Sequence, residues 1–157
     1  MINCIFENGN KASLRHAVVD VLIVNNDKIL LTKRALHLIE GGKYALAGGF
    51  LDRDETIIEG ARREAKEETG YDVNIIGLLR IKNRPDRRGE DRQNVSFVFI
   101  AEALDKVGEA DDESTEVVWF NLNGLPTKDN FAFDHYDDIA LYLKNKNNFY
   151  PLSFLES

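Results

Sequence analysis

Three glutamates, Glu64, Glu67 and Glu68, have the spacing of side chains that share one face of a helix. At about 100° per residue they fall within an arc of about 100°. Carboxylates crowded in this way repel one another unless a positive charge lies among them. Hard cations such as Mg²⁺ or Mn²⁺ prefer oxygen ligands in this arrangement. The pattern therefore indicates a metal site, and the alternative is a solvated helix face.

The neighbouring residues predict the helix that would carry these carboxylates. Asp54 lies where an N-cap is expected, and Gly70 is a suitable stop. Before the helix, residues 44–50 predict a short strand that ends in a glycine pair. Glycine lets the backbone approach a ligand closely, and the Gly49 carbonyl can serve as a metal ligand. The apolar stripe that would dock the helix on a sheet consists of Ile57, Ile58, Ala61 and Ala65.

The register of this stretch resembles the Nudix box, the signature of the Nudix hydrolase family. That signature runs Gly, five residues, Glu, seven residues, Arg-Glu, an aliphatic residue, any residue, Glu-Glu, any residue, Gly and an aliphatic residue. Ala65 is small for its aliphatic position and Tyr71 replaces the last aliphatic residue, so the departures concern packing more than chemistry. Ala47 also stands where many family members have proline. The matching residues are Gly49, Glu55, Arg63, Glu64, Glu67, Glu68 and Gly70.

The resemblance implies metal-dependent hydrolysis of a diphosphate bond in a nucleoside diphosphate derivative. Mg²⁺ (or Mn²⁺) would be the cofactor, and Glu55 and Arg63 would form an ion pair. Glu64 would also be a candidate for orienting the attacking water or taking its proton. The implied metal ligands are the Gly49 carbonyl, Glu64, Glu67 and Glu68.

The resemblance also implies a second catalytic glutamate, from a loop ahead of the strand that contains Trp119. Glu113, six residues before that tryptophan, is the preferred candidate. Glu109 and Glu116 are the alternatives.

Segments outside the box resemble the ADP-ribose pyrophosphatase branch of the family. They are Val19-Asp20, residues 29–31, 42–46 and 48–50, and Phe131 to His135. The last of these is close to a segment of Nudix domains related to bacterial nicotinamide-nucleotide metabolism. This likeness implies ADP-ribose as substrate, with AMP and ribose 5-phosphate as products. The alternatives are a house-cleaning nucleoside triphosphate pyrophosphatase of the 8-oxo-dGTP type and a catalytically inactive ligand-sensing module.

The predicted substrate-binding residues are Arg34, Phe50, Arg84 and Arg87. The last two belong to a loop, residues 83–92, that also contains Arg88 and Arg92. The guanidinium fork suits phosphate oxygens, but a solvated loop of mixed charge explains the same arginines.

Other side chains leave two interpretations open. Phe50, Phe131 and Phe133 could stack on adenine or could pack in a core. Asp20, in a buried strand, is either hydrogen-bonded structurally or in contact with ligand. His16 and His37 have no metal-ligand partner at a useful spacing.

The remaining segments predict one domain, residues 1–157, with a mixed sheet between helices. Residues 106–116 are expected to form a loop. This arrangement agrees with the α/β/α sandwich that the Nudix resemblance implies. Strands are expected at 2–6, 14–24, 28–34, 44–50, 73–82, 94–104 and 117–120, and a second helix at 134–146, capped by Asp134.

Composition limits the partners. The 157 residues are 43% hydrophobic, enough for one core, and the formal charge of −7 argues against binding to nucleic-acid backbones. The single cysteine, Cys4, allows no internal disulfide, and no signal peptide or membrane span is evident. We therefore expect a cytoplasmic protein with a small nucleotide diphosphate as its partner. A homodimer is also compatible with the sequence.

Overall fold

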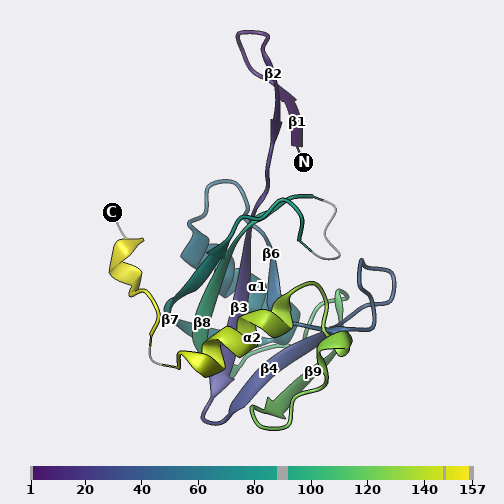
Figure 1. Cartoon of the computed structure of the whole chain (residues 1–157), viewed down its shortest axis with the longest axis vertical. Coiled ribbons are helices and arrows are strands. Elements are labelled where there is room, and N and C mark those ends of the chain that lie inside the picture. Colours follow the sequence, from purple (N-terminus) through teal and green to yellow (C-terminus); the bar gives the residue numbers. More distant parts are fainter. Residues whose placement is uncertain (1, 88–91, 147, 156–157) are drawn as a thin grey trace.

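A seven-stranded mixed sheet lies between two helices in the computed structural model, which describes residues 2–87, 92–146 and 148–155 (Figure 1). The strands of this sheet are β3 (Ala17–Asn25), β4 (Lys28–Arg34), β5 (Tyr44–Ala45), β6 (Ala47–Phe50), β7 (Tyr71–Lys82), β8 (Val95–Lys106) and β9 (Ser114–Asn121). The helices are α1 (Ile57–Thr69) and α2 (His135–Lys144), with short 3-10 helices η1 (Lys128–Asn130) and η2 (Leu152–Phe154).

The central strand β3 explains why both faces of the sheet are covered. It pairs in parallel with β8 and antiparallel with β4 and β6. Successive side chains of a strand point to opposite faces. Val19, Val21 and Ile23 belong to the core that contains the apolar stripe of α1. Leu22 and Val24 belong to the second core, which contains residues of α2. The predicted α/β/α arrangement is confirmed.

The helix that carries the three glutamates begins later than predicted. Asp54 is not its N-cap, because that position belongs to Thr56. The Thr56 side chain accepts a hydrogen bond from the Glu59 N–H, and the Glu59 carboxylate accepts one from the Thr56 N–H at 2.8 Å. This reciprocal pair is a capping box, and its Thr-x-x-Glu spacing is present in the sequence.

The N-terminal strands form a sheet of their own. The sequence predicts an edge strand at residues 2–6, but among the described strands β1 (Ile2–Ile5) pairs with β2 (Lys11–Leu14) alone, in a hairpin that projects from the body (Figure 1). The strand predicted at 14–24 is interrupted after Leu14. At the interruption, Arg15 donates hydrogen bonds to the carbonyls of Asn83 at 2.8 Å and Asn94 at 2.9 Å. Arg15 thereby ties together the two ends of the segment between β7 and β8.

The segment predicted as a loop at 106–116 is shorter in the structure. Strand β8 continues to Lys106 and β9 begins at Ser114. The loop between them lies beside α1, because the Asp111 N–H donates to the Glu67 carbonyl at 2.9 Å.

No helix among the described residues is both long enough and apolar enough to cross a membrane.

Candidate active site

A cavity of about 570 Å³ is lined by β6, α1, the loop before β9 and the residues that begin α2. Part of its wall is acidic and part is basic. This distribution suits a ligand with anionic groups that binds together with a cation. The acidic side chains are Asp20, Asp52, Glu64, Glu67, Asp111 and Glu113, and the basic ones include Arg34, Arg63, Arg87 and Arg92.

Two glycines of the motif are required by geometry. A Cβ atom on Gly49 would lie 2.5 Å from Glu64 Oε1, so any other residue would displace that carboxylate from the strand. Gly70 ends α1 in the left-handed conformation, with φ of 75°, as the sequence predicts. Gly49 therefore lets Glu64 of α1 approach β6 closely, and Gly70 ends the helix.

Arg63 joins the loop before α1 to the glutamates. Its Nη2 donates to Glu55 Oε1 at 2.7 Å and to the Phe50 carbonyl at 3.0 Å. Its Nη1 donates to Glu64 Oε1 at 2.8 Å and to Glu67 Oε2 at 3.0 Å. The hydrogen bond from Arg63 lowers the pKa of Glu55. The predicted ion pair between Glu55 and Arg63 is therefore present, and it extends to two further carboxylates.

Glu64 and Glu68 are crowded and poorly hydrated. Burial raises the pKa of Glu64, and burial together with the charge of Glu64 raises the pKa of Glu68 well above its ordinary value. Glu68 is only 4% exposed, and its Oε2 accepts a hydrogen bond from the Gly48 N–H at 3.2 Å. A cation among these oxygens would offset both unfavourable effects.

The donor set fits a hard divalent cation, although the side chains are engaged with other groups. In the part of the chain that the structure describes, no three acidic, histidine or cysteine residues already form a metal cage. Arg63 donates hydrogen bonds to Glu64 and Glu67, and Glu68 accepts one from the Gly48 N–H. Metal binding at these oxygens would require the Arg63 contacts to loosen.

The loop before β9 brings Glu113 to the cavity, whereas the two alternatives, Glu109 and Glu116, pair with lysines. Glu113 lines the cavity, and its charge contributes to the raised pKa of Glu64. Glu109 pairs with Lys106 at 2.9 Å, and Glu116 pairs with Lys33 at 2.8 Å. Only the preferred candidate of the three therefore lines this cavity. Its catalytic role stays a prediction.

The same loop supplies a residue that the sequence analysis missed. Asp111 lines the cavity, and its carboxylate accepts a hydrogen bond from the Glu113 N–H at 3.0 Å. Burial raises the pKa of Asp111. No spacing rule singles out Asp111 from its acidic neighbours, because the contact with α1 that places it is long-range.

The predicted substrate-binding arginines separate into two groups. Arg34 and Arg87 line the cavity, as does Arg92. Arg84 is absent from the lining, its side chain is 77% exposed, and it pairs with Asp86 at 2.8 Å. Arg88 lies outside the described residues.

Three phenylalanines named from the sequence also differ. Phe131 is buried in the second core, so its role is packing. Phe50 lines the cavity, is 39% exposed, and has the Arg92 guanidinium 5.2 Å from its ring centre. Phe133 lines the cavity in the left-handed conformation, with φ of 52°, and its ring centre lies 5.3 Å from the Arg34 guanidinium.

Asp20 and His135 form a buried pair at the cavity wall. Asp20 accepts a hydrogen bond from the Ser96 hydroxyl, and its Oδ1 lies 3.4 Å from His135 Nε2. The Leu46 N–H donates to His135 Nδ1 at 3.0 Å, which places the proton of a neutral imidazole on Nε2, facing Asp20. The structural interpretation of Asp20 holds, yet both side chains line the cavity. His135 was not identified from sequence, because a lone histidine has no spacing signal.

Comparisons with known proteins agree with this geometry. The NUDIX domain family model matches residues 14–140. An ADP-ribose pyrophosphatase from Methanocaldococcus jannaschii is 40% identical over 130 residues, 82% of this chain and 73% of that protein. An 8-oxo-dGDP phosphatase from Homo sapiens is 33% identical over 116 residues, 71% of this chain but 34% of that protein. The crystal structure of a NUDIX hydrolase from Nitrosomonas europaea superimposes with a TM-score of 0.77 at 26% identity, covering 96% of this chain and 89% of that one.

Proposed function

The chain belongs to the Nudix hydrolase family, and we propose that it hydrolyses ADP-ribose to AMP and ribose 5-phosphate. The observation that carries this assignment is the 40% identity to an ADP-ribose pyrophosphatase over most of both chains. The cavity supports it, because about 570 Å³ lies within the usual size range of small-molecule sites. Its acidic and basic walls suit a metal-bound diphosphate.

We propose that Glu64, Glu67, Glu68 and the Gly49 carbonyl hold Mg²⁺ or Mn²⁺. A divalent cation bound there would make a water more acidic and neutralise charge on the diphosphate. The raised pKa values of Glu64 and Glu68 support this ligand set, since burial leaves both carboxylates poorly hydrated and a cation would offset that cost.

The chain's own residues divide the remaining tasks. Glu64 or Glu113 would accept the proton of the attacking water, and breakage of one P–O bond would leave the new oxygen on the phosphate that was attacked. Arg34 and Arg87 would contact phosphate oxygens, and Phe50 would contact the base. Arg84 lies outside the lining, so its proposed contact is with a part of the substrate that extends out of the cavity.

A second function is supported by the identity of 33% to an 8-oxo-dGDP phosphatase. In this alternative the substrate is an oxidised or non-standard nucleotide, such as 8-oxo-dGTP. The third alternative, an inactive ligand-sensing module, is disfavoured because all three box carboxylates are present on α1.

Side-by-side kinetics on ADP-ribose, dGTP and 8-oxo-dGTP test the assignment. We expect a higher kcat/KM for ADP-ribose, because a basic wall of several arginines suits a diphosphate that joins two sugars. Products should be AMP and ribose 5-phosphate, formed with Mg²⁺ and not with excess EDTA. A clear preference for either triphosphate would exclude ADP-ribose as the substrate and leave the hydrolase assignment intact. Binding without turnover would favour the ligand-sensing alternative.

We also propose that the chain forms a homodimer through the β1–β2 hairpin. An isolated two-stranded hairpin is marginally stable in water, and this one projects from the body (Figure 1). Residues 2–14 contain one acidic side chain, Glu7, and one basic side chain, Lys11, so the hairpin has no net charge. Two copies can therefore meet there without charge repulsion. Its exposed apolar side chains are Ile2, Ile5, Phe6 and Leu14.

Light scattering after size exclusion tests the dimer. Wild type should have about twice the chain mass of 17.8 kDa, and Ile5→Lys combined with Phe6→Lys should have the single-chain mass. Leu36→Lys is the control, because Leu36 is 84% exposed in the loop between β4 and β5. A monomeric wild type, or dimer loss in the control alone, would contradict the proposal.

A further inference from the structure

A cluster of buried charges lies between the sheet and the start of α2. Its centre is Lys82, whose Nζ lies 3.1 Å from Asp20 Oδ2, 3.0 Å from Asp134 Oδ1 and 2.8 Å from Asp138 Oδ2. The Lys82 side chain is 6% exposed, and the Asp138 side chain is fully buried. The cluster draws on β3, the end of β7 and α2, so it forms only in the folded chain.

Two arginines complete the cluster. Arg80 pairs with Asp138 at 2.5 Å. Arg87 donates to both oxygens of Asp134, from Nη2 at 2.7 Å and from Nε at 3.2 Å. This two-point contact fixes the plane of the guanidinium as well as its position.

Docking of α2 does not explain this cluster. Buried ion pairs contribute little net stability, because the loss of hydration offsets the attraction. The helix is already held by Ile139 and Tyr142 in the second core. Asp134 occupies the N-cap position of α2 as predicted, yet its side chain makes no capping hydrogen bond. Its carboxylate is directed instead to Lys82 and Arg87.

The position of the cluster suggests its use. Asp20, Arg87 and His135 line the cavity, so the buried charges continue into its wall. The loop offers an internal comparison in Arg84, three residues before Arg87. Arg84 pairs only locally with Asp86 among the contacts described, remains 77% exposed and does not reach the cavity lining. Arg87 is 6% exposed and does reach it. Among the contacts described, Arg87 pairs with Asp134 and Arg84 does not.

We propose that Asp134, itself held by Lys82, is a positioning residue that orients the Arg87 guanidinium toward the diphosphate of the substrate. This inference rests on the proposed function, because it takes Arg87 as the group that contacts the phosphates. A guanidinium fixed before the substrate arrives loses less conformational freedom on binding than a free loop arginine does. The effect falls on binding rather than on the chemical step, since the diphosphate is present in the ground state and in the transition state.

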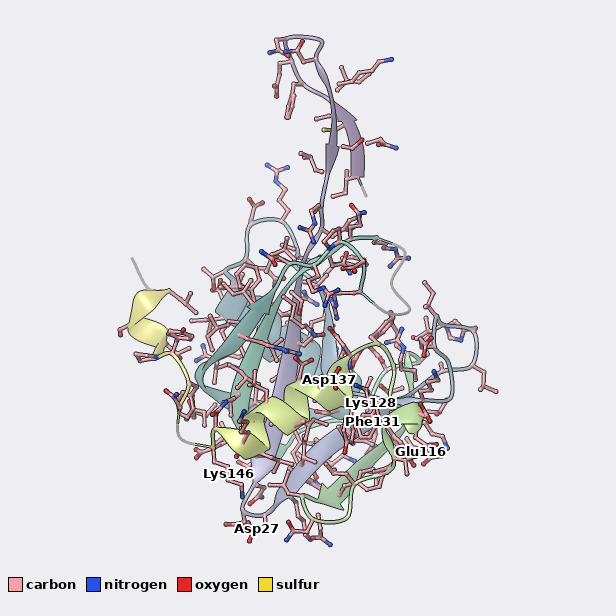
Figure 2. The ribbon with its side chains drawn as sticks, viewed as in Figure 1. Asp27, Glu116, Lys128, Phe131, Asp137 and Lys146 are labelled. Carbon is pink, nitrogen blue, oxygen red and sulfur yellow. The ribbon has the colours of Figure 1, made fainter. Side chains whose placement is uncertain are left out.

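Steady-state kinetics of Asp134→Asn with ADP-ribose and Mg²⁺ test the proposal. KM should rise about tenfold while kcat stays within about threefold, as expected when a charged hydrogen-bonded pair that aids binding is lost. Asp137→Asn is the matched control. Asp137 lies three residues further along the sequence, pairs with Lys128 at 2.5 Å and is 46% exposed. Both side chains are labelled in Figure 2. The control should leave both parameters unchanged.

A double-mutant cycle separates positioning from a merely structural role. Arg87→Gln should raise KM at least as much as Asp134→Asn. In the Arg87→Gln background, Asp134→Asn should then change KM by less than about twofold, because Asp134 acts through Arg87. Independent, multiplying effects on KM would overturn the proposal. An unchanged KM in Asp134→Asn, or a fall in kcat alone, would overturn it as well.

Two further arms keep the test decisive. If Asp134→Asn does not fold, Asp134→Glu takes its place. The longer side chain keeps the negative charge beside Lys82 but displaces the Arg87 guanidinium. An unchanged KM in this variant would contradict the positioning role. If wild type does not hydrolyse ADP-ribose, the proposed function is wrong, but the positioning role of Asp134 is still testable. The same variants are then compared by calorimetric binding of ADP, where Asp134→Asn should raise Kd about tenfold. An unchanged Kd, or no ADP binding by wild type, would overturn the inference.

Discussion

Glu68→Gln should lower kcat by about 10²–10⁴-fold and at the same time stabilise the metal-free protein. Glutamine has nearly the same shape and can still accept the hydrogen bond from the Gly48 N–H, which is 3.2 Å long with glutamate. What is lost is one negative charge from the proposed metal ligands. Activity falls because the cation would be held less tightly and in a changed position.

The gain in stability follows from the surroundings of Glu68. Burial and the charge of Glu64 raise the pKa of Glu68 well above its ordinary value, so the ionised form destabilises the folded state at neutral pH. A neutral amide removes this penalty. In EDTA, Glu68→Gln should therefore have a higher Tm than wild type. With saturating Mg²⁺, wild type should gain stability by mass action, about 2.7 kcal/mol at one hundred times Kd, and the variant should gain less.

Thermal denaturation and kinetics, each with Mg²⁺ and with EDTA, check both parts. Glu109→Gln is the control, because Glu109 is 89% exposed and pairs with Lys106. Activity of Glu68→Gln within threefold of wild type at saturating Mg²⁺ would remove Glu68 from the ligand set. A lower Tm than wild type in EDTA would mean that the buried carboxylate is stabilising, contrary to its surroundings.

The acidic part of the site could be predicted from sequence because it is local. Glu64, Glu67 and Glu68 lie within one helix, where the spacing of residues in the sequence sets the direction in which their side chains point. Gly49 lies in β6, and a single loop separates that strand from the helix. The start of the helix was misplaced at Asp54 because two kinds of cap signal competed. The capping box of Thr56 and Glu59 satisfies two backbone groups at once, and it prevailed.

The basic part could be predicted only in part: Arg34 and Arg87 were named and line the cavity, but which arginines of residues 83–92 reach it depends on contacts that are distant in sequence. Arg84 and Arg87 have the same chemistry in the same loop, and the contact of Arg87 with Asp134, 47 residues away, is a difference that no local pattern reports. His135 reaches the cavity through the docking of α2 on the sheet, which no local pattern reports. The strand break after Leu14 also depends on contacts that are distant in sequence, because Arg15 donates hydrogen bonds to carbonyls beyond the end of β7.

Lys82→Met should lower the free energy of unfolding by about 3–5 kcal/mol, the usual effect of removing one partner of a buried ion pair. Burial alone would lower the pKa of Lys82, but the charges of Asp20 and Asp138 outweigh it and raise that pKa. Methionine fills a similar volume without the charge. It would leave Asp20 and Asp138 buried with one fewer cation, in a domain whose total stability is about 5–15 kcal/mol.

Urea denaturation at pH 7 measures this loss, with Lys106→Met as the control. Lys106 is 45% exposed and pairs with Glu109, so its removal should change stability by less than about 1 kcal/mol.

The lowered pKa of Asp134 explains the choice of pH 7. Burial would raise its pKa, but Arg87 and Lys82 lower it from 3.8 to about 2, so its stabilising effect is complete at neutral pH and is lost as pH falls toward 2. The difference between Lys82→Met and wild type should therefore shrink below pH 4. A variant as stable as wild type at pH 7 would show that these carboxylates tolerate the loss of Lys82, and Lys82 could not then be what holds Asp134 in place.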